Sequence, residues 1–89
     1  MAAKEDLQKL IEAIVAGNRE MAAIEAEKAL ESGIPPYRIV IQGCSRAMSR
    51  VGDLYQNGEY FIPEMLMSAR AFEASMNVIK PKLKDTDIQ

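Results

Sequence analysis

The sequence predicts an all-α protein, an antiparallel four-helix bundle with up-down-up-down connections. Two observations predict it. Apolar residues recur with a period near 3.6 in four segments, and glycine, proline or asparagine stands between each segment and the next. The 89 residues suffice for one domain, and no segment shows the alternation typical of a strand. Short connections place successive helices side by side and in opposite directions.

The first two predicted helices are separated by Gly17 and Asn18. Gly17 is a typical C′ stop, and Asn18 is a typical N-cap for the helix that follows. The second helix ends at Ser32-Gly33, and its thin apolar face, made largely of alanines, lets a neighbouring backbone come close. The first helix covers residues 6–16, where the apolar positions are Leu7, Leu10, Ile11, Ile14 and Val15.

The third predicted helix follows an extended link at Pro35-Pro36, with Pro36 at its first position. Gly43 and Gly52 lie in its interior, each at a cost of about 1 kcal/mol relative to alanine. Such a cost indicates close packing of the backbone or close approach of another group. The apolar positions of this helix are Val40, Cys44, Ala47, Met48, Val51, Leu54 and Tyr55.

The fourth predicted helix follows a left-handed stop at Asn57-Gly58 and has Pro63 at its first position. Glu64, in the first turn, is expected to interact favourably with the helix dipole. The helical period continues until Pro81. Its apolar positions are Ile62, Met65, Leu66, Ala69, Phe72, Met76 and Ile79.

The composition excludes several classes of function. The chain has no histidine, which removes the usual general base and the commonest metal ligand, and a single cysteine rules out a conventional zinc site. We therefore expect no catalytic residue and no metal site. The net charge of −2 argues against nucleic acid, and no apolar run approaches the roughly 20 residues that span a membrane. The lone Cys44 and the lack of a signal peptide indicate a cytoplasmic protein, with Cys44 buried in the core.

A calcium loop is one interpretation of the turn before the fourth helix. Asp53, Asn57, Gly58 and Glu64 occupy positions 1, 5, 6 and 12 of the helix–loop–helix calcium pattern. However, Tyr55 stands at position 3, where an oxygen ligand is required. The oxygen ligands that remain are too few for calcium, so we predict no calcium site.

The corner between the third and fourth helices is unusually apolar for a turn. Its large side chains either plug the end of the bundle or present an apolar surface to a partner. The residue types leave both alternatives open. The side chains concerned are Tyr55, Tyr60, Phe61, Ile62 and Met65.

The same corner resembles the helical cap module of methionine synthase and of the corrinoid proteins of methyltransferase systems. The shared motif is M-x-x-V-G-x-x-[aromatic]-x-x-G-x-x-F-[aliphatic]-P-[E/Q]-x-x-x-S-A, and here it runs without a gap from Met48 to Ala69. The flanking segments SGIPPYRIVIQG and NVIKPKL are also similar to that family, so the resemblance covers nearly the whole chain.

The resemblance implies a role for the chain and for three of its residues. A cap of this kind covers the upper, methyl-bearing face of cobalamin, shields it from water and moves away to admit a methyltransferase. By motif position, the cofactor contacts are expected at Tyr55, Ile62 and Met65. The chain would then be no enzyme by itself but part of a corrinoid-dependent methyltransferase system, with methylcobalamin as the cofactor of the intact protein.

The family's second domain is absent from these 89 residues. In the family that domain is an α/β unit whose D-x-H-x-x-G motif supplies the lower cobalt ligand. Residues 1–80 are therefore expected to form the cap bundle, and residues 81–89 the start of an interdomain linker. We expect the chain alone to bind cobalamin poorly and to self-associate weakly through its uncovered corner. The alternative is a free-standing helical interaction or dimerisation domain whose aromatic corner binds a protein.

Overall fold

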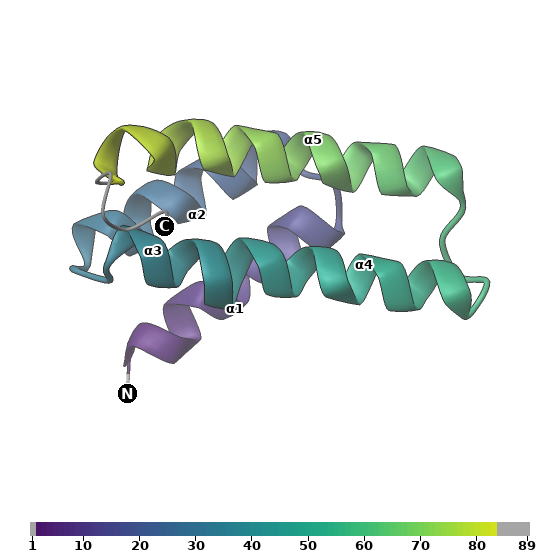
Figure 1. Ribbon diagram of the computed structural model, residues 1–89, viewed down its shortest axis with the longest axis horizontal. Coiled ribbons are helices and arrows are strands. Elements are labelled where there is room, and N and C mark those ends of the chain that lie inside the picture. The colour runs from purple at the N-terminus through teal and green to yellow at the C-terminus, as the bar shows by residue number, and fades with distance from the viewer. Residues whose placement is uncertain (1, 84–89) are drawn as a thin grey trace.

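The computed structural model describes residues 2–83, which form a four-helix bundle in which each helix runs opposite to the one before it (Figure 1). The third helix of the bundle is a continuous rod of three segments. These described residues contain no strand, so the predicted fold class is confirmed. The elements are α1 (Ala2–Val15), α2 (Arg19–Glu31), α3 (Pro36–Ile39), a π-helical segment (Val40–Ser45), α4 (Arg46–Gln56), α5 (Ile62–Ile79) and a 3₁₀ turn (Lys80–Lys82).

The turn between α1 and α2 has the predicted conformation. Gly17 has a φ of +74°, and its N–H donates to the carbonyl of Ile14 at 3.0 Å. The N–H of Asn18 donates to the carbonyl of Ala13 at 2.9 Å, which completes a Schellman motif at the end of α1. The side chain of Asn18 accepts a 3.1 Å hydrogen bond from the N–H of Met21 and so caps α2.

The rod formed by α3, the π-helical segment and α4 differs from a regular α-helix in its middle. The wider π turn, which apolar spacing did not reveal, lies where α1 packs against the rod. A Cβ added to Gly43 would lie 3.0 Å from Cδ2 of Leu10, which confirms the expected close packing there. At Gly52 the same atom would meet nothing within 4 Å, so no neighbour within the described chain explains that glycine.

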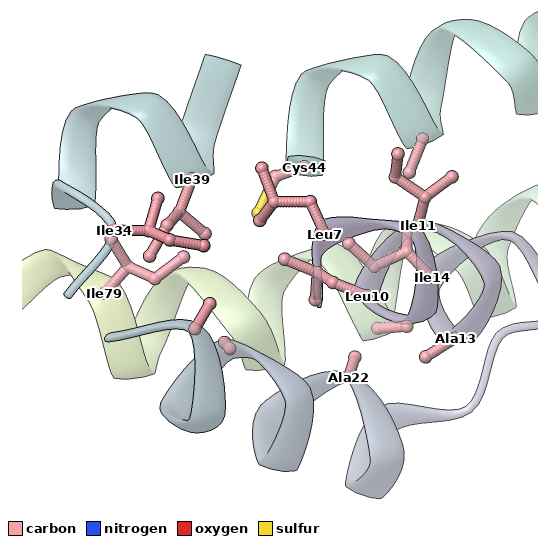
Figure 2. Packing of buried hydrophobic residues seen from close by; sticks show 14 residues of the cluster. Leu7, Leu10, Ile11, Ala13, Ile14, Ala22, Ile34, Ile39, Cys44 and Ile79 are labelled. Atoms are coloured by element: carbon pink, nitrogen blue, oxygen red, sulfur yellow. The ribbon is translucent and has the colours of Figure 1, made fainter. Parts of the chain in front are cut away.

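The core lies between α1, α2, the rod and α5. Ala22, Ala26 and Ala29 are fully buried, and their small side chains let α2 pack closely against α1 and α5. In Figure 2, Ile34, Ile39 and Ile79 meet at one end of the core. The other large buried side chains are Leu7, Leu10, Ile11, Ile14, Cys44 and Val51.

Cys44 is buried, as predicted, and its Sγ lies 3.3 Å from Oγ of Ser75. Because the Ser75 hydroxyl donates to the carbonyl of Phe72 at 2.7 Å, the thiol is the donor to Ser75. Burial raises the pKa of the Cys44 thiol above its usual value.

The two ends of α5 differ slightly from the prediction. Helix α5 begins at Ile62, so Pro63 occupies its second position and not its first. Phe61 is extended and acts as the N-cap, and its N–H donates to Oε1 of Glu64 at 2.9 Å. A proline fits at either position, because neither N–H has an intrahelical acceptor. At the other end Leu83 packs against the core; residues 84–89 of the predicted linker lie outside the described residues.

Candidate functional site

The hairpin formed by the end of α4 and the start of α5 projects beyond the α1–α2 turn (right side of Figure 1). We call its large side chains the apolar corner: Tyr55, Phe61, Ile62, Met65 and Leu66. Phe61 is 62% exposed, Ile62 and Leu66 are each 56% exposed, and Tyr55 is 47% exposed. Met65 is half-buried. The exposures of Tyr55, Phe61 and Ile62 favour an apolar surface over a plug, whereas Tyr60, which the prediction also placed in this corner, is half-buried.

Two hydroxyl side chains at the base of the apolar corner, Tyr60 and Ser68, bond to the C-terminal end of α1. The hydroxyl of Tyr60 donates to the carbonyl of Val15 at 2.6 Å, and the hydroxyl of Ser68 donates to the same carbonyl at 2.9 Å. Tyr60 is half-buried and Ser68 is fully buried. Tyr60 is thus the one aromatic residue of the turn that faces the bundle.

The three residues predicted to contact the cofactor all lie in the apolar corner. Tyr55 is in the last turn of α4, whereas Ile62 and Met65 are in the first turn of α5. Their role as contacts stays a prediction. Phe61, which the motif contains but the predicted contacts omitted, is the most exposed of the large apolar side chains, and Leu66 is similarly exposed.

The apolar corner offers apolar surface and no strong metal ligand. Residues 53–66 include no lysine or arginine, and the charged residues among them are Asp53, Glu59 and Glu64. Glu64 is engaged by the N–H of Phe61. Within residues 7–83, no group of three or more histidine, cysteine, aspartate or glutamate side chains is placed to hold a metal ion. None of the described helices is long and apolar enough to cross a membrane.

The fold is that of the helical module of corrinoid proteins. The structure of the monomethylamine corrinoid protein from Methanosarcina barkeri matches it with a TM-score of 0.83 and 35% identity, over 86% of this chain and 36% of that one. Residues 6–80 match the family described as "B12 binding domain". The chain belongs to this family, and the predicted resemblance to the corrinoid cap module is confirmed.

Curated relatives give the same result. Monomethylamine corrinoid protein 1 from Methanosarcina acetivorans is 39% identical over 89 residues, which are all of this chain and 41% of that protein. Trimethylamine corrinoid protein 1 from the same organism is 38% identical over 85 residues, which are 94% of this chain and 39% of that protein. The chain therefore spans about two fifths of the length of these relatives.

Proposed function

We propose that this chain is the cap of a corrinoid methyl carrier, which covers the upper face of cobalamin and controls access to it. The observation that supports the proposal best is the exposed apolar corner, carried on a projecting hairpin in a member of the B12 binding domain family. Monomeric proteins seldom leave such a cluster of large apolar side chains in water without a use for it. A broad macrocyclic face is a surface that such a cluster can cover, with the exclusion of water.

The chain's residues suit a cover rather than a ligand to cobalt. Bound methylcobalamin would supply the transferable methyl group; Tyr55, Ile62 and Met65 would lie over it, with Phe61 beside them. A cover of this kind must not compete for the metal. The chain has no imidazole, and its one thiol is buried at Cys44 with a raised pKa, so no thiolate is presented.

The remaining parts of the system would come from outside these residues. A histidine that binds the lower face of cobalt must belong to another domain, because this chain has none. We propose that the apolar corner covers the cofactor held by this domain and moves away when a partner methyltransferase needs access to it. The relatives carry the names of different methylamines at nearly equal identity, 39% and 38%, so the similarity does not select the methyl donor.

The test uses the full reading frame that encodes this chain, expressed and supplied with cobalamin. We expect a coloured protein with a shifted corrinoid spectrum, and a colourless product from residues 1–89 alone. Once methylcobalamin is bound, Tyr55→Ala and Ile62→Ala should lose the methyl group faster than the unchanged protein. Matched controls are Tyr37→Ala and Ile41→Ala. These residues are similarly exposed, 51% and 47%, but they lie in α3 and in the π-helical segment, away from the apolar corner.

A colourless full-length product, or equal rates of methyl loss in all four variants, would contradict the cap function. The free-standing interaction domain would then be the better hypothesis, since it needs the same exposed corner but no cofactor.

A further inference from the structure

The C-terminus of α1 offers a backbone acceptor to other parts of the chain. The Schellman hydrogen bonds from Gly17 and Asn18 go to the carbonyls of Ile14 and Ala13. The carbonyl of Val15, the last residue of α1, is bonded instead by the side chains of two distant residues. Carbonyls at a helix C-terminus carry the negative end of the helix dipole, which strengthens the bonds that they accept.

Both donors belong to the base of the apolar corner. Tyr60, 45 residues after Val15, lies in the turn directly before Phe61 and Ile62. Ser68, 53 residues after Val15, lies in the second turn of α5 and is fully buried. One acceptor thus holds both the turn and the helix that follows it, so neither can shift along α1 independently of the other.

We propose that Tyr60 and Ser68 are positioning residues for the cap, which set the orientation of the apolar corner without contacting the cofactor. The inference rests on the proposed function. An apolar cover excludes water only if its side chains are held in place before the cofactor meets them, and ordering them on contact would weaken the complex. Since the corner projects from the bundle, the Val15 carbonyl holds its base to α1, beside the close contact of Gly17 with Met67.

The test uses the full reading frame loaded with methylcobalamin and the variants Tyr60→Phe, Ser68→Ala and both together. Tyr60→Phe removes one oxygen and keeps the ring. We expect amide hydrogen exchange over residues 57–66 to become about three- to tenfold faster in each single variant, with core amides of α2 unchanged. Loss of the methyl group should accelerate in parallel. Tyr37→Phe and Ser49→Ala, at exposed positions elsewhere, are the matched controls.

The outcomes separate the positioning role from the cap function. Unchanged exchange over residues 57–66 would overturn the inference, because the two hydroxyls would then not hold the corner. Faster exchange with unchanged methyl loss would also overturn it, since the anchor would serve only stability. In the loaded protein the cap function itself is tested independently by Ile62→Ala, which leaves both hydroxyls in place, and it fails if that variant keeps the methyl group as well as the unchanged protein does.

Discussion

Gly17 and Met67 lie so close together that a Cβ on Gly17 would be 2.8 Å from Cβ of Met67 and 3.3 Å from its backbone carbonyl carbon. The α1–α2 turn therefore rests directly on the backbone of α5. Gly17 also has a φ of +74°, in the region that favours glycine. Glycine is therefore favoured at this position for two separate reasons: the turn requires a positive φ, and α5 leaves no room for a side chain.

We expect Gly17→Ala to lower the free energy of unfolding by about 2–4 kcal/mol, because left-handed backbone strain and overpacking against Met67 add. Gly33→Ala is the matched control. Gly33 also has a positive φ, +96°, but a Cβ there would meet nothing within 4 Å, so only about 1–2 kcal/mol should be lost. Urea denaturation followed by circular dichroism measures both. Equal losses would mean that the turn and α5 are not in tight contact.

The two glycines inside the third helix should respond differently to alanine. Gly52→Ala is expected to raise the free energy of unfolding by about 0.5–1 kcal/mol, because the position is helical and open. Gly43→Ala should gain less or lose stability, since the fully buried Leu10 must move to admit a methyl group. The same urea series compares them. A larger gain at Gly43 than at Gly52 would contradict this account.

Truncation of the apolar corner should cost little stability. Tyr55→Ala and Ile62→Ala in residues 1–89 are expected to change the free energy of unfolding by no more than about 0.5 kcal/mol, since both side chains are about half exposed. Ile14→Ala, at a fully buried position, should cost about 2–5 kcal/mol. Thermal unfolding compares the three variants. If Tyr55→Ala or Ile62→Ala lowered the free energy of unfolding as much as Ile14→Ala, these side chains would fill the end of the bundle and would not face water.

Weak self-association of residues 1–89 is expected through the apolar corner, because water contact with Phe61 and Ile62 is unfavourable. A sedimentation-velocity series over protein concentration should show a rising average mass. Phe61→Ser and Ile62→Ser should suppress the rise, whereas Ile41→Ser, at another exposed position, should not. A strict monomer at the highest concentration would contradict self-association through the apolar corner.

Alkaline pH should destabilise the protein partly through Cys44. Its thiol has a higher pKa in the folded state than in the unfolded state, owing first to burial. As pH rises above about 8.5, the unfolded chain releases this proton while the folded chain retains it, so the free energy of unfolding falls. The fall between pH 8 and 10 should be smaller in Cys44→Ala, as urea denaturation at each pH would show. Identical slopes in the two proteins would mean that the thiol ionises freely in the fold.

Much of the secondary structure follows from short stretches of sequence. The stop at Gly17, the cap at Asn18 and the left-handed Gly58 are each determined within one turn of chain, and all three are as predicted. The start of α5 was displaced by one residue, because proline fits both of the first two helical positions. The π-helical segment was not predicted, since it lies where α1 packs against the rod and apolar spacing carries no signal of that contact.

The sequence by itself determined four amphipathic helices, their order, four of the five residues of the apolar corner and its resemblance to a corrinoid cap. Whether the corner fills the bundle or faces water was decided only by tertiary structure, because burial depends on which helices reach that far along the bundle. The shared acceptor at Val15 was likewise beyond prediction from the sequence. Capping and periodicity act over a few residues, whereas exposure and a hydrogen bond across 53 residues arise only when all four helices pack together.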